Sequence, residues 1–126
     1  MDKNVFNAKN APEAVGPYSH GAKVGNMLIL SGQIPLDPAT GKIVDGGVAA
    51  QTKRVLKNIA GVLESQSGTL SNVVKTTIYL TDMNDFPVVN ETYAGFFEEP
   101  FPARTTVAVA ALPKGAAVEI EVIAVL

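Results

Sequence analysis

The chain has 126 residues, with ten basic and twelve acidic side chains that give a formal net charge of −2. The absence of cysteine excludes disulfides, thiolate catalysis and cysteine-ligated metals, and no cluster of Lys and Arg forms the basic footprint of a nucleic-acid-binding protein. No apolar run is long enough to span a membrane, and the first residues lack the apolar core of a signal peptide. We therefore expect a cytoplasmic protein of one domain, residues 1–126, that binds neither nucleic acid nor membrane.

The first half of the chain predicts strands followed by one helix. Residues 4–8 (NVFNA) can form a short strand, and residues 19–35 contain two strand-like runs around a Gly-Asn pair, a turn signal that predicts a hairpin. Residues 47–66 follow helical spacing, with an apolar stripe along one side and polar residues, Asn58 among them, along the other.

The second half predicts a strand, a second helix and a closing hairpin. Residues 72–82 are rich in β-branched side chains. Asp85 is a candidate N-cap of the second helix, and Pro87 is tolerated in its first turn. The apolar stripe of that helix consists of Phe86, Val89, Tyr93 and Phe96. Residues 100–126 read as two apolar strands joined by a Pro-Lys-Gly turn. The order β-β-α-β-α-β-β predicts an α+β fold with one mixed sheet and two helices on one of its faces.

The expected strands are unusually apolar. Residues 27–32 (MLILSG) and 107–112 (VAVAAL) carry small or apolar side chains on both faces, whereas a sheet covered on one side normally exposes a polar second face. In so short a chain the simplest cover is another copy of the same chain, so we expect a homo-oligomer.

The closing hairpin contains one arginine and two glutamates. If residues 112–115 form the loop of this hairpin, two residues lie opposite each other when their numbers add up to 227. The side chain of Arg104 then lies on the same face of the sheet as those of Glu119 and Glu121. A register shift of one residue would separate them. Two interpretations remain open: an exposed cross-strand ion pair that contributes about 0–1 kcal/mol, or a pocket covered by the oligomer in which the guanidinium binds a ligand carboxylate.

The motifs resemble those of a known family. The C-terminal stretch resembles the signature of the Rid family, the reactive intermediate deaminases, in which Pro-Ala-Arg precedes a strand and an Ile/Val-Glu-Ile segment follows. Three upstream blocks also resemble the family, so that the likeness covers nearly the whole chain in one order. In this sequence the four blocks read APEAVGPYSHG, LILSGQIPLDPATGKIV, VVKTTIYLTDMNDFPVVNETY and YAGFFEEPFPARTTVAVAALPKGAAVEIEVIAVL.

The resemblance implies a fold, an assembly and an activity. The implied fold is chorismate-mutase-like, and the implied assembly is a homotrimer with three clefts between subunits. The implied reaction is hydrolysis of short 2-imino acids and their enamine tautomers (2-aminoacrylate, 2-iminopropanoate and 2-iminobutanoate) to 2-oxo acids and ammonia. Removal of these metabolites protects pyridoxal-phosphate enzymes from covalent damage. No metal or cofactor is implied.

The resemblance also implies roles for particular residues. Arg104 matches the arginine that binds the substrate carboxylate, and Glu119 matches the glutamate that positions the attacking water. Tyr18 and Ser31 match residues that line the pocket, and Gly32 matches a backbone contact. Each pocket residue has a plainer interpretation: Tyr18 can be a core aromatic, and Ser31-Gly32 can simply end a strand.

Two further residues, Asn90 and Thr106, belong to the same hypothesis, and the parts of Glu121 and His20 stay open. Asn90 matches a polar wall residue near the arginine, although it can also be an exposed helix residue. Thr106 stands where many relatives carry a cysteine, and the contact implied there is made by the backbone. Glu121 either tunes Glu119 or forms a structural pair. The only histidine, His20, lies near Tyr18 in sequence, and a lone histidine more often packs or hydrogen-bonds than carries a proton.

Other functions compete with deamination. Some relatives of this kind are translation inhibitors or endoribonucleases, but the net acidity, the absence of a basic patch and the lack of a histidine pair argue against RNA cleavage. A non-catalytic trimer that binds 2-oxo acids or acts as a chaperone could use the same clefts. Chorismate mutase shares only the implied fold, and its dicarboxylate substrate requires more cationic groups.

Overall fold

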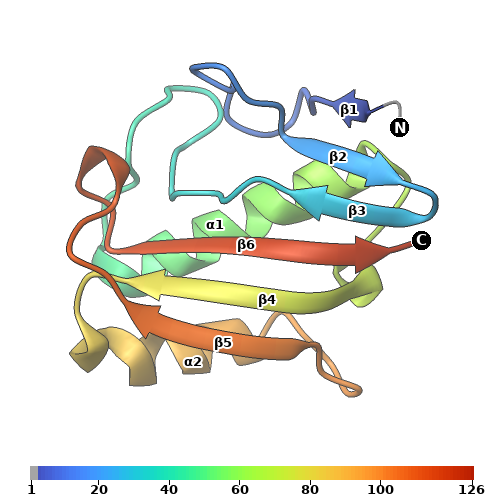
Figure 1. Cartoon of the computed structure of the whole chain (residues 1–126). Coiled ribbons are helices and arrows are strands. Elements are labelled where there is room, and N and C mark those ends of the chain that lie inside the picture. The colour runs from blue at the N-terminus through green and yellow to red at the C-terminus, as the bar shows by residue number, and fades with distance from the viewer. Residues whose placement is uncertain (1–2) are drawn as a thin grey trace.

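A computed structural model describes residues 3–126, which form one six-stranded sheet with two helices against one face (Figure 1). The predicted α+β architecture is therefore confirmed. The main elements are β1 (Asn4–Phe6), β2 (Gly21–Val24), β3 (Met27–Leu30), α1 (Gly47–Glu64), β4 (Val73–Leu80), α2 (Phe86–Ala94), β5 (Ala103–Ala108) and β6 (Val118–Val125).

The predicted hairpin in the first half of the chain is confirmed. Strands β2 and β3 pair in antiparallel orientation with Val24 opposite Met27. Gly25 lies in the turn at a φ of 60°, a backbone conformation that glycine adopts without steric cost. The short strand expected near the N-terminus is β1, which pairs with β2.

The predicted closing hairpin is wrong. The strand order is β1-β2-β3-β6-β4-β5, so that β6 lies between β3 and β4, and β5 pairs with β4 in parallel orientation (Figure 1). Helix α2 provides the crossover that a parallel pair requires. The burial of the two strands explains their places: every second residue of β6 is buried, as in a central strand, whereas β5 is mostly exposed and forms an edge.

The core lies between the sheet and helix α1, with α2 beside it. The buried apolar residues of α1 are Val55, Leu56, Ile59, Val62 and Leu63. Asn58, expected on the polar side of this helix, is fully buried instead. Its side chain donates hydrogen bonds to the carbonyl oxygens of Ile34 (3.4 Å) and Leu36 (2.9 Å), which offset the cost of burying the amide.

The start of α2 is confirmed in position but not in its capping contact. Asp85 occupies the N-cap position and Pro87 lies in the first turn, yet the Asp85 side chain makes no capping hydrogen bond. Asp82 instead accepts a hydrogen bond of 2.9 Å from the backbone N–H of Asn84, in the short 3₁₀ turn that precedes the helix.

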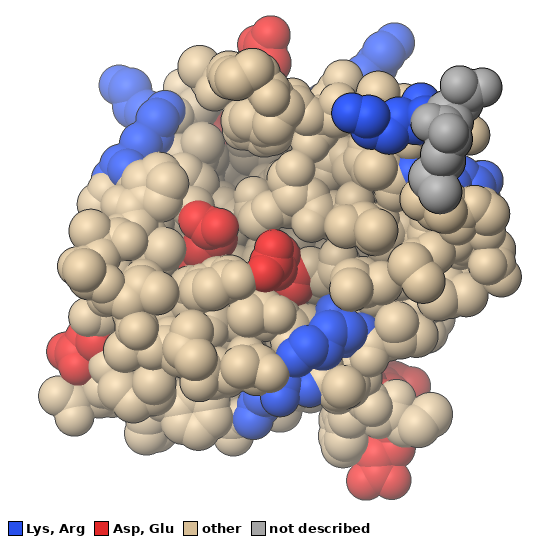
Figure 2. Space-filling model, in the orientation of Figure 1, with Lys and Arg blue, Asp and Glu red and all other residues tan. Residues whose placement is uncertain are grey.

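The face of the sheet opposite the helices is open and largely uncharged, with acidic groups near its middle (Figure 2). The register places Val5, Val24, Met27 and Ile29 on this face, and all four are exposed. Exposed apolar area of this kind marks surfaces that bind partners. Among residues 3–126, neither helix has the length and hydropathy needed to cross a membrane.

Candidate active site

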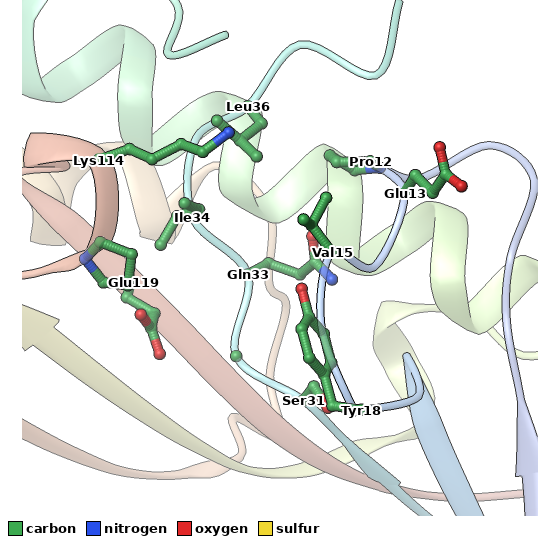
Figure 3. A pocket seen from close by; sticks show the side chains of 12 residues that line it. Pro12, Glu13, Val15, Tyr18, Ser31, Gln33, Ile34, Leu36, Lys114 and Glu119 are labelled. Atoms are coloured by element: carbon green, nitrogen blue, oxygen red, sulfur yellow. The ribbon is translucent and has the colours of Figure 1, made fainter. Parts of the chain in front are cut away.

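A pocket of about 440 Å³ opens beside the glutamate on β6, between the N-terminal loop and the loop after β3 (Figure 3). Strand β6 contributes the carboxylate of Glu119. The other residues that line the pocket are Pro12, Glu13, Val15, Tyr18, Ser31, Gly32, Gln33, Ile34, Leu36, Pro113 and Lys114. Four of the residues that the sequence predicts for a site, Tyr18, Ser31, Gly32 and Glu119, therefore lie around one pocket.

Backbone hydrogen bonds fix the loop after β3 against β6. The N–H of Gln33 donates to the carbonyl of Ile120 (2.9 Å), and the N–H of Ile120 donates back to the carbonyl of Gln33 (3.2 Å). Gly32 thereby lies against the side chain of Glu119. A Cβ added at Gly32 would lie 3.0 Å from the carboxyl carbon of Glu119, so only glycine admits the carboxylate in this position without displacing it.

Burial and charge alter the acidity of the Glu119 carboxyl group. The side chain is half-buried, and this desolvation is the main cause that raises its pKa, with the negative charge of Glu121 as the second cause. Glu121 itself accepts a hydrogen bond from the hydroxyl group of Tyr79. That bond is the largest of the effects that raise the pKa of Tyr79. A carboxyl with a raised pKa is suited to take up and return a proton.

Tyr18 and Ser31 take positions that agree with lining a pocket. Tyr18 is 51% exposed, so the interpretation as a core aromatic is wrong. The hydroxyl of Ser31 donates a hydrogen bond of 2.6 Å to the carbonyl of Ser19, and the N–H of Ser31 donates to the carbonyl of His20 (2.9 Å). These bonds tie the segment that carries Tyr18 to the end of β3.

His20 is a structural residue. It is buried, with 2% of its surface exposed, and its Nδ1 accepts a hydrogen bond of 2.8 Å from the N–H of Ala8. Its Nε2 therefore carries the proton and donates it to the carbonyl of Pro12 at 2.7 Å. Since both ring nitrogens are engaged with the backbone, His20 supports the pocket wall at Pro12 and has no free nitrogen for proton transfer.

Arg104 lies away from the Glu119 pocket, on the exposed edge strand β5. Its Nη1 donates a hydrogen bond of 2.7 Å to Oδ1 of Asn90, and its guanidinium lies 5.4 Å from the ring centre of Phe86 and 5.1 Å from that of Tyr93. All three partners come from α2 and are uncharged, so these contacts orient the guanidinium without neutralising it. The pocket of about 480 Å³ at this place is lined by Asn90, Tyr93, Ala94, Phe101, Pro102 and Arg104.

The aromatic support of Arg104 is itself fixed. The hydroxyl groups of Tyr93 and Thr76 are hydrogen-bonded at 3.0 Å, and the Tyr93 ring stacks on Phe97 with centroids 4.5 Å apart. Burial raises the pKa of Tyr93, against smaller opposing effects of the Thr76 hydrogen bond and the Arg104 charge. The phenol therefore stays neutral and keeps its hydrogen bond near neutral pH.

The structure does not bring Arg104 and Glu119 together within one chain. Arg104 pairs with Thr76, whose side chain is buried on the helix side of the sheet, whereas Glu119 pairs with Tyr79 on the open side. The prediction that Arg104, Glu119 and Glu121 share a face is therefore wrong, because β4 lies between the two strands that were expected to pair. The alternative of a cross-strand ion pair fails for the same reason.

Thr106 lies two residues after Arg104 on the same side of β5. It pairs with Ile78 of β4, and its hydroxyl group is buried without a hydrogen-bond partner among the described residues. The sequence reasoning missed Tyr79, Phe86 and Tyr93 as site residues. The positions 86, 90 and 93 repeat at the spacing of one helix face, which is the signal that could have connected both aromatics with Asn90.

Comparison with known proteins finds relatives that match nearly the whole chain. A family model described as Endoribonuclease L-PSP matches residues 8–126. A RutC family protein of Pyrococcus horikoshii is 51% identical over 97% of each chain. The 2-iminobutanoate/2-iminopropanoate deaminase of Homo sapiens is 46% identical over 98% of this chain and 90% of its own length.

Solved structures have the same fold. RidA from the Antarctic bacterium Psychrobacter sp. superposes with a TM-score of 0.94 at 45% identity, covering 98% of this chain and 99% of that one. E. coli TdcF with bound serine superposes with a TM-score of 0.92 at 39% identity, with coverage of 98% and 99%. The match of family model, relatives and fold over nearly the whole chain shows that the protein belongs to the Rid family, whose domain model is described as Endoribonuclease L-PSP.

Proposed function

We propose that the protein is a hydrolase that deaminates short 2-imino acids, among them 2-aminoacrylate, 2-iminopropanoate and 2-iminobutanoate, to 2-oxo acids and ammonia in the cytoplasm. One observation carries the proposal: the chain offers an arginine oriented by the uncharged side chains of Asn90, Phe86 and Tyr93 and, separately, a half-buried glutamate whose pKa is raised. These are an anion-binding group and a proton acceptor. The human relative that is named as a deaminase of two such imines supports the same substrates.

The reaction requires the two groups at one site, and we propose that a homotrimer of chorismate-mutase-like form provides it. The open apolar face of the sheet supports this assembly, because Val5, Val24, Met27 and Ile29 would be covered there by another copy. In this arrangement Arg104 of one protomer meets the Glu119 pocket of its neighbour. The site would then form only where two copies meet.

The proposed chemistry needs few groups. The planar guanidinium of Arg104 binds the substrate carboxylate through two parallel hydrogen bonds and so fixes the imine carbon. The ionised carboxylate of Glu119 takes a proton from water while the water oxygen bonds to that carbon, which gives a carbinolamine. Protonated Glu119 then returns the proton to the amine nitrogen. The C–N bond breaks, the electron pair leaves with ammonia, and the hydroxyl proton is released as the 2-oxo group forms.

The protein's main contribution is placement. A protonated imine is already electrophilic, so the reaction as proposed involves no metal and no cofactor. Holding the carbon and the water in contact lowers the entropic part of the barrier, and general base assistance adds about 10²–10⁴-fold to the rate. Tyr18 and the apolar residues Val15 and Ile34 would limit the side chain that the pocket accepts.

The test is a coupled assay in which an amino-acid deaminating enzyme produces the imine in situ. Glu119→Gln keeps the shape of the side chain and loses the base, so we expect imine clearance to fall about 10²–10⁴-fold while the affinity for 2-oxobutanoate stays close to that of the wild type. Equal clearance by the two proteins would contradict the proposed role of Glu119. A wild-type protein that binds 2-oxobutanoate but clears no imine would be a passive binder.

RNA cleavage is the second candidate, and the description of the family model as an endoribonuclease favours testing it. The one histidine of the chain has both ring nitrogens bonded to the backbone, which leaves it unsuited to phosphodiester cleavage. RNA cleavage that persists through repurification and falls with Glu119→Gln would support this candidate against deamination.

A further inference from the structure

A tyrosine and a second carboxylate accompany Glu119 on the open face of the sheet. Tyr79 of β4 lies directly opposite Glu119 of β6, and the next residue of β6 on the same face is Glu121, opposite Thr77. The hydroxyl of Tyr79 reaches diagonally to Glu121 and donates its hydrogen to Oε1. All three side chains are partly buried, so that their charges are only partly screened by water.

We propose that Glu121, held in place by the Tyr79 hydroxyl, is a positioning residue that keeps the negative charge of the carboxylate pair on itself and so makes Glu119 the member that takes up and returns the proton. This inference rests on the proposed function and deepens it. Neither Tyr79 nor Glu121 lines the pocket around Glu119, so both act through Glu119.

The asymmetry of hydrogen bonding distinguishes the two carboxylates. Two carboxylates on one strand face disfavour each other's ionisation, and a hydrogen bond donated to one of them stabilises its charged form. The Tyr79 hydroxyl donates its hydrogen bond to Glu121, whereas Glu119 faces the pocket and Gly32. The geometry therefore assigns to Glu119 the proton that moves in the proposed reaction. Burial first and the Glu121 charge second raise the pKa of Glu119, in agreement with this division.

The proposed reaction benefits from that division. Water attack needs Glu119 ionised, and ammonia departure needs it protonated, so a pKa closer to the working pH serves both steps. Within one chain the charged or titratable groups that face Glu119 from other elements are few, and in the proposed trimer Arg104 of the neighbouring protomer joins them. Around the pocket they are Glu13, Tyr18 and Lys114, and on the open face they are Tyr79, opposite Glu119, and Lys75, which precedes Tyr79 on β4. Lys114 Nζ lies 3.4 Å from the carbonyl of Gly41, and Lys75 Nζ donates to Thr105 (2.7 Å).

The test is the pH dependence of turnover in the coupled assay for the wild type, Glu121→Gln and Tyr79→Phe. Removal of the Glu121 charge lowers the pKa of Glu119, so the acidic limb of the kcat profile moves to lower pH by about half a unit to one unit. Tyr79→Phe removes the hydrogen bond that holds Glu121, and the acidic limb should move in the same direction by a smaller amount. The double variant shifts no further than Glu121→Gln alone, since both changes act on one interaction.

Thr105→Val is the matched control, because Thr105 lies on the same face and its hydroxyl bonds to Lys75 without contacting the pair. Its profile should coincide with that of the wild type. Glu121→Gln and Tyr79→Phe profiles that also coincide with the wild type would overturn the inference, whatever their effect on stability.

A direct titration separates this inference from the proposed function. The Glu119 side-chain carboxyl carbon, followed by NMR in the full-length assembled protein labelled with ¹³C-glutamate, should titrate at lower pH in Glu121→Gln than in the wild type. If the wild type clears no imine, the proposed function fails while this titration still decides the inference. An unchanged Glu119 midpoint in both variants would refute it.

Discussion

The Glu119 half and the Arg104 half of the proposed site are built in different ways. Glu119 projects from a central strand into a pocket whose wall is bonded to that strand by backbone hydrogen bonds. Arg104 projects from an exposed edge strand and is held by side chains of α2, through an amide and two aromatic rings. One half depends on the packing of the whole sheet, and the other depends on one helix and one edge.

This difference indicates how the halves should respond to change. A substitution at Arg104 removes a contact at the surface and leaves the core untouched. A change near Glu119 also disturbs the loop that closes the pocket. Since the two groups lie on opposite sides of one sheet, each half can be altered without touching the other within a chain.

The largest effect on the arginine half should come from Arg104→Ala. The loss of a charge-assisted contact that contributes about 1.5–3 kcal/mol lowers kcat/KM about 10- to 150-fold. Arg104→Lys should recover only part of this loss, because an ammonium cannot bind a carboxylate through a planar fork. Thermal unfolding should change little for either variant. Full activity of Arg104→Ala in the coupled assay would remove the arginine half from the site.

A mixing experiment tests whether the two halves come from different copies. Arg104→Ala and Glu119→Gln should each lose most of the activity, but random co-assembly of the two in equal amounts should join an intact Arg104 with an intact Glu119 at roughly a quarter of sites. We expect the mixture to recover about that fraction of wild-type clearance. Activity equal to the mean of the two separate variants would place the whole site in one chain or show that no site of this kind exists.

Gly32→Ala should disturb the glutamate half alone. The added methyl group needs the space now taken by the carboxylate of Glu119, so the carboxylate shifts and kcat falls about tenfold. The affinity for 2-oxobutanoate, which the proposed function assigns to Arg104, should change less. Gly95→Ala is the control, since a Cβ there meets only the carbonyl of Thr92 at 3.4 Å. A Gly32→Ala protein with wild-type kcat would mean that this carboxylate position is unimportant.

The smallest effect on turnover should follow from Asn58→Ala. This change removes the donors that hold the carbonyls of Ile34 and Leu36, and it leaves Arg54 without its acceptor. The free energy of unfolding should fall by about 1–3 kcal/mol in chemical denaturation. Lys57→Ala, at an exposed neighbouring position, should stay within about 0.5 kcal/mol of the wild type. Equal stability of the two variants would show that the buried amide does not secure the pocket wall.

The sequence predicted the local elements well because their signals are local. The helical spacing of residues 47–66, the Gly-Asn turn before Met27 and the β-branched run of β4 each depend on neighbours within a few residues. Strand order depends on contacts between distant segments. The Pro-Lys-Gly turn is compatible with a hairpin. No local feature of Ala103–Ala108 or Val118–Val125 indicates that β4 separates these two strands in the sheet.

The candidate site shows the same division. The resemblance of the motifs singled out Arg104 and Glu119, but it could not say that one chain separates them. The uncharged partners of Arg104 on α2 and the bond between Tyr79 and Glu121 depend on side-chain packing between elements. Asn58 was misplaced because its polarity predicts exposure, whereas two backbone carbonyls within reach make its burial favourable.

The position of β6 between β3 and β4 also affects how the protein is made. During synthesis every other strand leaves the ribosome before β6, and until then β3 and β4 lack the neighbour that joins them. The nascent chain therefore presents two unpaired strand edges and an incomplete core, which are features that promote association with other chains. Productive folding must wait for the strand that carries Glu119, so the same segment that supplies the carboxylate also ends the period in which the new chain is vulnerable to aggregation.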